Sequence, residues 1–275
     1  MDTLIPSQAA HRTKDILSPD ASDETKTQTA RWFAEVMTKD FLSSELPEDV
    51  DCHNMALGEI IDSLVGRVDG AVIDALRLIK ELGDKASHYH PQRRITKEEA
   101  EKAVKASLGL YQKILVDHLK KHPLSLHPDR ATLLSTLLPS IRLEVIGCLI
   151  DWGDFDSEQN MALLHKWCLA CVKSGKRDKG RRKLRQLVNR NKICQEFAAY
   201  EERSMNEIAE RMKNDELPVP QNHSDFARNL ADVKRGLSKE SADFNRKLIE
   251  LLEGMAKDVE PSDMAHHKGM QIFLV

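Results

Sequence analysis

The sequence has few cysteines, few aromatic residues and no long apolar run. Its five cysteines are odd in number and widely spaced, which does not fit a disulfide framework: Cys52, Cys148, Cys168, Cys171 and Cys194. No apolar stretch reaches the roughly 18 residues that a membrane-spanning helix requires, and the first fourteen residues lack the apolar core of a secretory signal. We therefore expect a cytoplasmic protein without membrane contact, whose thiols act mainly as small core hydrophobes.

The compact motifs of common enzyme classes are also missing. There is no phosphate-binding glycine loop, no nucleophile elbow and no zinc-protease motif. His165, Cys168 and Cys171 are close in sequence, but no second ligand pair completes a tetrahedral zinc site. We expect no cofactor and no bound metal.

Charge is distributed unevenly along the chain. The net charge is −3, yet residues 173–192 contain ten Lys or Arg and one acid, a local charge of +9. Such a run is a candidate surface for binding phosphate backbones in a salt-sensitive, sequence-independent way. The candidate nucleic-acid-binding residues are Lys176, Arg177, Lys179, Arg181, Arg182, Lys183 and Arg185. The segment contains no aromatic residue, so base stacking is not indicated. A solvated surface or a docking site for an acidic protein patch is the alternative.

Hydrophobic periodicity of about 3.6 residues predicts an all-α fold. Residues 1–24 are expected to form a loose arm and residues 25–121 an N-terminal bundle of four helices. A helical region at 129–257 and a tail at 258–275 follow. Two prolines within 122–129 mark the boundary between the bundle and the second region.

The four helices of the bundle are expected near residues 25–43, 57–65, 70–88 and 96–121. Thr96 and Glu99 form a capping-box pattern at the start of the fourth. A long polar helix is expected over 178–213. The apolar segment 272–275 either folds back on the core or adds a strand to a partner's sheet.

A polar stripe runs along the third predicted helix: Asp74, Arg77, Glu81, Asp84 and His88. If the helix continues to His88, Asp84 lies one turn away and can orient the imidazole. An imidazole held in this way is a candidate general base. The alternative is a solvated helix face that ends in a loop.

Residues 25–120 resemble the HEPN-like (higher eukaryotes and prokaryotes nucleotide-binding) helical domain superfamily, in particular a short branch of unknown function. Helices carrying 30–35, 58–61 and 76–79 lead into the motif Gly-Asp-Lys-Ala-Ser-His at 83–88. In the ribonucleases of the superfamily the motif is Arg, a polar residue, three residues and His, often followed by Tyr. Asp84 matches the polar position, His88 the histidine and Tyr89 the tyrosine. Gly83 stands where the arginine is expected.

The resemblance implies RNA binding or metal-independent RNA cleavage by a homodimer, in a bacterial stress or phage-defence setting. His88 would be the general base at a ribose 2′-hydroxyl and Asp84 would orient it. Arg77, or Lys85 or Arg93 from the following loop, would take the place of the arginine at the scissile phosphate. The alternative is a non-enzymatic binding or regulatory module that contacts a partner protein or a nucleotide.

Overall fold

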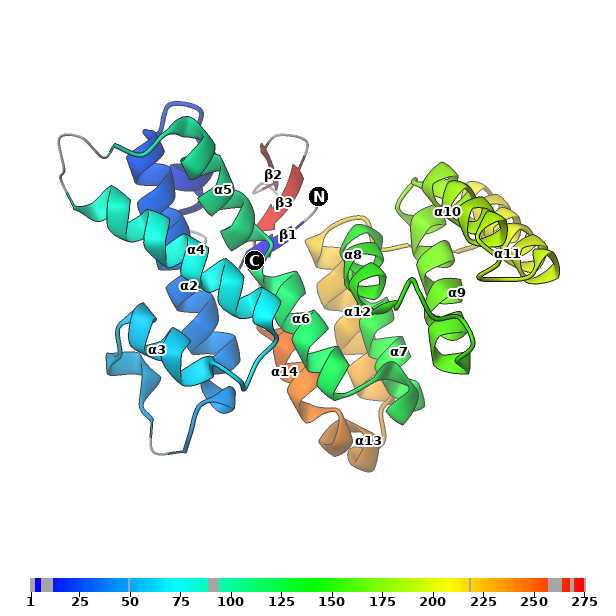
Figure 1. The fold of residues 1–275 in the computed structure, drawn as a ribbon. Coiled ribbons are helices and arrows are strands. Elements are labelled where there is room, and N and C mark those ends of the chain that lie inside the picture. The colour runs from blue at the N-terminus through cyan, green and yellow to red at the C-terminus, as the bar shows by residue number, and fades with distance from the viewer. Residues whose placement is uncertain are drawn as a thin grey trace. The chain divides into compact units, whose positions relative to one another are not determined.

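The structure is a computed structural model that describes residues 3–5, 12–48, 50–88, 94–217, 219–256, 264–267 and 270–274. Most of the described residues are helical, which confirms the predicted all-α fold. A small three-stranded sheet accompanies them (Figure 1). Among the described helices, none is long and apolar enough to cross a membrane.

The chain divides into two compact units. The first comprises Met1–His118 together with Glu250–Val275, and the second comprises Leu119–Ile249. The boundary predicted at 122–129 lies a few residues beyond the observed one. The predicted tail, 258–275, belongs to the first unit.

Among its described residues, the first unit contains five complete helices: α1 (Thr13–Leu17), α2 (Asp23–Leu42), α3 (Leu57–Leu64), α4 (Gly70–Ser87) and α5 (Lys97–Leu108). Short 3-10 turns at Ser43–Glu45 and Cys52–Asn54 connect α2 to α3. Helix α6 (Leu110–Lys121) begins in this unit, and α14 (Arg246–Glu253) ends in it.

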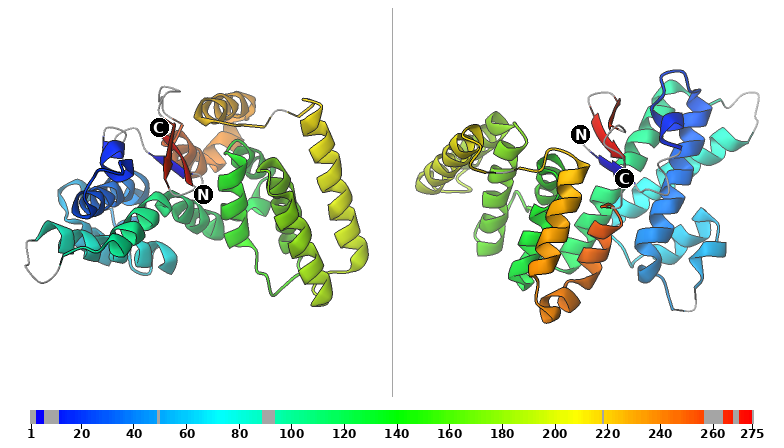
Figure 2. Two further views of the ribbon diagram at one scale, coloured as in Figure 1. Left: turned by 90° about the horizontal axis from the view of Figure 1, so that it is seen from above. Right: turned by 180° about the vertical axis from the view of Figure 1, so that it is seen from behind.

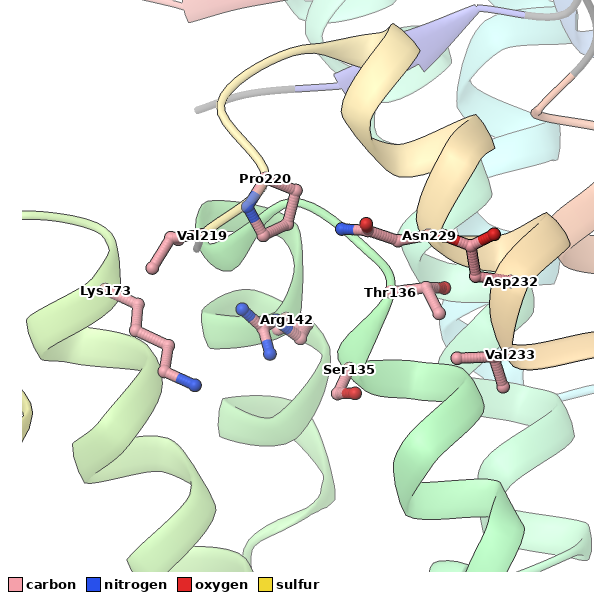
Figure 3. Close-up of a pocket in the computed structure, with 9 residues that line it drawn as sticks. All are labelled: Ser135, Thr136, Arg142, Lys173, Val219, Pro220, Asn229, Asp232 and Val233. Carbon is pink, nitrogen blue, oxygen red and sulfur yellow. The ribbon is translucent and has the colours of Figure 1, made fainter. Parts of the chain in front are cut away.

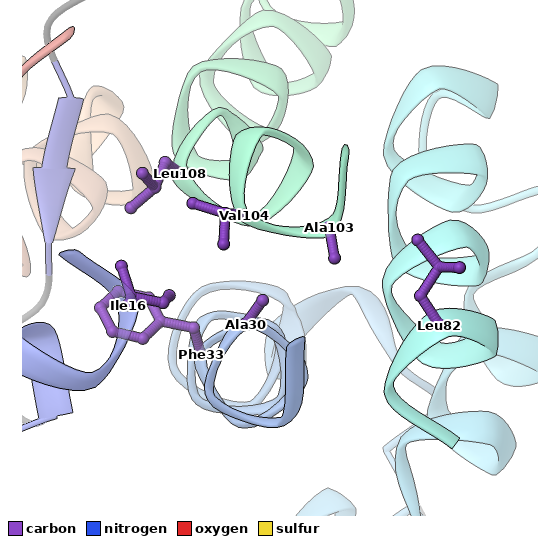
Figure 4. Packing of buried hydrophobic residues seen from close by; sticks show 7 residues of the cluster. All are labelled: Ile16, Ala30, Phe33, Leu82, Ala103, Val104 and Leu108. Carbon is purple, nitrogen blue, oxygen red and sulfur yellow. The ribbon is translucent and has the colours of Figure 1, made fainter. Parts of the chain in front are cut away.

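The core of the first unit lies where α1, α2, α4 and α5 pack together. Its buried cluster consists of Ile16, Ala30, Phe33, Leu82, Ala103, Val104 and Leu108 (Figure 4). Ile16 is fully buried on α1, next to Phe33 of α2. The prediction of a loose arm over residues 1–24 is therefore wrong for residues 13–17, because burying an apolar side chain in the core fixes that short helix in place.

The single helix predicted over 96–121 is two helices, α5 and α6, separated at Gly109. Glycine is a weak helix former, because its backbone loses more conformational freedom than that of other residues. The predicted capping box at the start of α5 is confirmed. Thr96 Oγ1 accepts a hydrogen bond from the Glu99 N–H at 3.3 Å, and the Glu99 carboxylate accepts one from the Thr96 N–H at 2.9 Å.

The sheet joins segments from both ends of the chain. Strand β3 (Met270–Leu274) is central, with β1 (Thr3–Ile5) parallel on one side and β2 (Met264–His267) antiparallel on the other. Figure 2 shows the three strands side by side. The apolar C-terminal segment thus pairs with strands of its own chain.

The second unit contains the remaining helices: α7 (Pro128–Ser135), α8 (Pro139–Leu149), α9 (Glu158–Lys173), α10 (Arg177–Asn189), α11 (Gln195–Lys213), α12 (His223–Gly236) and α13 (Lys239–Phe244). A 3-10 turn at Leu124–Leu126 precedes α7. The long helix predicted over 178–213 is wrong, because the chain turns between α10 and α11. Asn191 has a φ of 51° in that turn, and a left-handed residue of this kind commonly ends a helix.

Removal of one buried hydroxyl tests the packing of the first unit. Tyr111 is almost fully buried, and its hydroxyl donates to the Leu251 carbonyl at 3.0 Å. Burial raises the pKa of Tyr111 above its usual range. We expect Tyr111→Phe to lower the free energy of unfolding by about 1 kcal/mol, because the Leu251 carbonyl loses its buried donor.

Urea unfolding checks this expectation, with Tyr200→Phe as the matched control, since Tyr200 is 51% exposed. Equal free energies for the two variants would contradict a stabilising role for the Tyr111 hydroxyl.

Candidate functional site

Helix α10 presents most of the basic segment. Its apolar side is formed by Leu184 and Leu187, which are buried. Helices α9, α10 and α11 lie side by side in both ribbon figures (Figures 1 and 2). This packing leaves the other faces of α10 to the arginines and lysines.

Four of the seven predicted nucleic-acid-binding residues have exposed side chains: Lys176, Lys179, Arg182 and Arg185. The Arg182 Nε donates to the Asp178 carbonyl at 3.3 Å, a contact with neutral backbone. Within the part of the chain that the structure describes, none of the ten cations in 173–192 is ion-paired with a carboxylate. Their charge is therefore available to an external anion.

Two lysines of the segment contact tryptophans from outside it. Lys183 Nζ lies 4.0 Å from the ring centre of Trp152, and Lys179 Nζ lies 5.8 Å from that of Trp167. These are cation–π contacts, which orient α10 without neutralising it. Burial, followed by repulsion from Arg190, lowers the pKa of Lys183. We conclude that Lys183 mainly anchors the helix.

Arg177 and Arg181 converge on one neutral acceptor. Both guanidinium groups donate to Asn206 Oδ1 on α11, Arg181 at 2.9 Å. The Nε atoms of both arginines are buried and have no hydrogen-bond partner among the described residues. An amide oxygen accepts these hydrogen bonds but brings no negative charge, so the pair remains cationic.

The Asp84–His88 motif is arranged differently from the predicted stripe. Helix α4 ends at Ser87, and His88 has an extended backbone with φ −108° and ψ 118°. The His88 N–H caps the helix by donating to the Asp84 carbonyl at 3.2 Å. The His88 side chain is exposed. Among the described residues, no hydrogen bond or ion pair joins the His88 imidazole to the Asp84 carboxylate.

The Asp84 carboxylate instead pairs with two cations. Arg31 of α2 approaches one oxygen to 3.2 Å, and Lys80 of α4 approaches the other to 2.6 Å. Arg31 lies 53 positions before Asp84, and no local pattern indicates that the two residues meet.

Two of the proposed substitutes for the missing arginine, Arg77 and Lys85, lie on α4, so Lys85 is not in the following loop as predicted. Arg77 is exposed on α4, and Lys85 pairs with Glu99 at 2.6 Å. The hydrogen bond from Lys85 is the main reason that the pKa of Glu99 is lowered. Tyr89 and Arg93 are outside the described residues.

Gly83 has a packing role at the crossing of α2 and α4. A Cβ at position 83 would lie 2.5 Å from Arg31 Cδ and 2.6 Å from Arg31 Cβ. Contacts this short cannot be relieved by moving only the end of the arginine side chain. Glycine therefore allows Arg31 to lie across α4 and reach Asp84.

The cysteines near His165 lie in a helical core. Cys168 and Cys171 are fully buried on α9, as expected for core thiols. Burial raises the pKa of both, that of Cys171 to about 12. His165 Nδ1 lies 2.9 Å from the buried Glu201 carboxylate. Among the described residues, no group of three or more His, Cys, Asp or Glu side chains is placed to hold a metal.

No protein-family model, no curated protein and no solved structure matches this chain. The resemblance to the HEPN-like superfamily therefore stays a prediction.

Substitution of Gly83 tests the close crossing of α2 and α4. We expect Gly83→Ala to lower the free energy of unfolding by about 1–3 kcal/mol, because the new methyl group overpacks against Arg31. Gly70→Ala is the matched control on the same helix, since a Cβ there meets no atom within 4 Å. The control should be neutral or slightly stabilising. Chemical denaturation compares the two, and a Gly83→Ala variant as stable as Gly70→Ala would contradict the crossing.

Proposed function

We propose that the protein binds RNA through the cationic surface of α10, without reading base sequence. This α10 surface consists of Lys176, Arg177, Lys179, Arg181, Arg182 and Arg185. The observation that carries the proposal is their lack of carboxylate partners within the described part of the chain. RNA is the expected polyanion because of the HEPN-like resemblance, which also implies a homodimer.

The geometry of α10 suits a phosphate backbone. The helix has 13 residues and is therefore roughly 20 Å long, enough to face several consecutive phosphates. Arg181 and Arg185 are four positions apart, and like charges at this spacing repel each other and weaken a free helix. Phosphates bound along the helix would relieve that repulsion. The contacts would be to the backbone, so unrelated RNA sequences should bind alike.

Arg182 and Arg185, the two exposed arginines of the α10 surface, provide the test of RNA binding. We expect Arg182→Gln with Arg185→Gln to weaken binding to unrelated RNAs equally, because both arginines would contact phosphates. For single-stranded RNA, the slope of log affinity against log salt concentration should become less steep by up to ~1.4. Each lost phosphate contact accounts for ~0.7 of this change. Fluorescence anisotropy with labelled RNAs over a series of salt concentrations measures both quantities.

A matched double variant controls for net charge. Arg228 and Arg246 are 67% and 68% exposed in the second unit, and each already pairs with an aspartate. Arg228→Gln with Arg246→Gln should leave the salt dependence unchanged. If the α10 variant also leaves it unchanged, the α10 surface does not bind RNA, and an acidic protein partner becomes the better assignment.

Metal-independent RNA cleavage is a second candidate function, and Arg31 is the observation that favours it. Arg31 brings a guanidinium from α2 to Asp84, although the motif itself has Gly83 where an arginine is expected. A guanidinium beside the motif could contact a scissile phosphate, with exposed His88 as the general base. The non-enzymatic alternative assigns the same residues to helix packing.

Loss of cleavage in single variants decides between these alternatives. If the protein cuts RNA, His88→Ala should abolish cleavage, because it removes the general base. Asp84→Asn should reduce cleavage less, and EDTA should have no effect. His53→Ala is the control, since His53 is also exposed in the first unit. The assay uses labelled transfer RNA and messenger RNA. If the His88→Ala variant still cleaves RNA, the catalytic residue is not His88. If the wild type cleaves neither RNA, RNA binding is the only candidate function of the two that remains.

A further inference from the structure

The second unit contains a pocket of about 260 Å³. It lies among α8, α9, α12, the link between α7 and α8, and the segment before α12 (Figure 3). Its lining consists of Ser135, Thr136, Arg142, Lys173, Val219, Pro220, Asn229, Asp232 and Val233. The pocket is separate from the α10 surface, with which it shares no residue.

Among the described residues, Arg142 is a buried cation without an ion-pair partner. Its side chain projects from α8 into the pocket, and the residue is only 7% exposed. Its Nε atom is buried and has no hydrogen-bond partner among the described residues. Burial lowers the pKa of Arg142 to about 10. A buried charge in this state is costly unless another group satisfies it.

Lys173 supplies a second cation to the same space. It is the last residue of α9, and in Figure 3 its ammonium group points toward the space that the Arg142 guanidinium enters. The pKa of Lys173 is lowered by burial first and then by Arg142 and Arg211. The two cations thus repel each other across the pocket.

The remaining lining does not neutralise them. Asp232 on α12 is the acidic residue of the lining, and its carboxylate is already paired with Arg235. The side-chain nitrogen of Asn229 points into the pocket in Figure 3 and adds a donor. Val219, Pro220 and Val233 supply the apolar part of the lining and carry no charge.

We propose that this pocket binds a phosphate group between Arg142 and Lys173, either as inorganic phosphate or as part of a small phosphate monoester. Arginine offers a fork of donors that matches two oxygens of a phosphate, and lysine adds a compact charge. A pocket of this volume holds a phosphate with a few waters or a small organic group. This site would give the protein a small-molecule ligand in addition to RNA.

Calorimetric titration of the full chain tests the site with three probes, namely inorganic phosphate, glycerol 3-phosphate and acetate. We expect both phosphates to bind and acetate to bind at least tenfold more weakly. Tighter binding of glycerol 3-phosphate would identify a monoester as the ligand, and tighter binding of inorganic phosphate would identify the free ion. Arg142→Met and Lys173→Met should each weaken phosphate binding at least tenfold, because each removes one of the two cations.

Lys213→Met is the control, since Lys213 is 76% exposed at the end of α11. A wild type that binds neither phosphate, or an Arg142→Met variant that binds both unchanged, would overturn the proposal.

Thermal unfolding separates the site from general salt effects. Without phosphate, Arg142→Met should melt no lower than the wild type, because the substitution removes an unpaired buried charge. Added phosphate should raise the melting temperature of the wild type and leave that of the variant unchanged. An equal gain in both proteins would mean that phosphate stabilises the chain without binding this pocket. RNA binding through the α10 surface should be the same in both, so failure of either proposal is distinguishable.

Discussion

Three cations of α10 are held in place by contacts that carry no negative charge. Arg177 and Arg181 share an amide oxygen of Asn206, and Lys183 lies over the ring of Trp152. Apolar burial of Leu184 and Leu187 keeps α10 in place beneath them. The fold therefore stabilises this helix by means that leave its electrostatic repulsion in place, and an anionic ligand would gain the energy that relief of the repulsion provides.

Around Asp84 in the first unit, by contrast, cations are paired with carboxylates. Asp84 is satisfied by Arg31 and Lys80, and Lys85 by Glu99. These pairs link α4 to α2 and α5, so the same contacts that balance charge also join neighbouring helices. The contrast supports a binding role for α10, and it explains why the motif around Asp84 is also compatible with a purely structural role.

Helical periodicity and the capping box, which depend only on residues close in sequence, were confirmed in the first unit. The periodic positions Ala30 and Phe33 are in the core, and the Thr96–Glu99 capping box forms as expected. The end of α4 was missed by one residue, because helix periodicity does not show which residue adopts the extended cap conformation.

Contacts between distant segments could not be predicted from the sequence. The pairing of Arg31 with Asp84, and that of Lys183 with Trp152, each require the packing of separate helices or loops. The sequence also gives no sign that Arg142 lacks an ion-pair partner among the described residues, because an arginine on an apolar helix resembles any surface arginine that extends to solvent. The basic segment itself was evident because charge composition needs no tertiary information.

The sheet has a consequence for the order in which the protein folds during synthesis. Strand β1 precedes the second unit in the chain, but its partner β3 follows the whole of that unit and is synthesised only after it. The Leu251 carbonyl, which accepts a hydrogen bond from the Tyr111 hydroxyl, is also synthesised after the second unit. The second unit, whose residues are contiguous, can therefore fold on the ribosome while the first is still incomplete. The first unit therefore completes its fold only after the second unit has been synthesised.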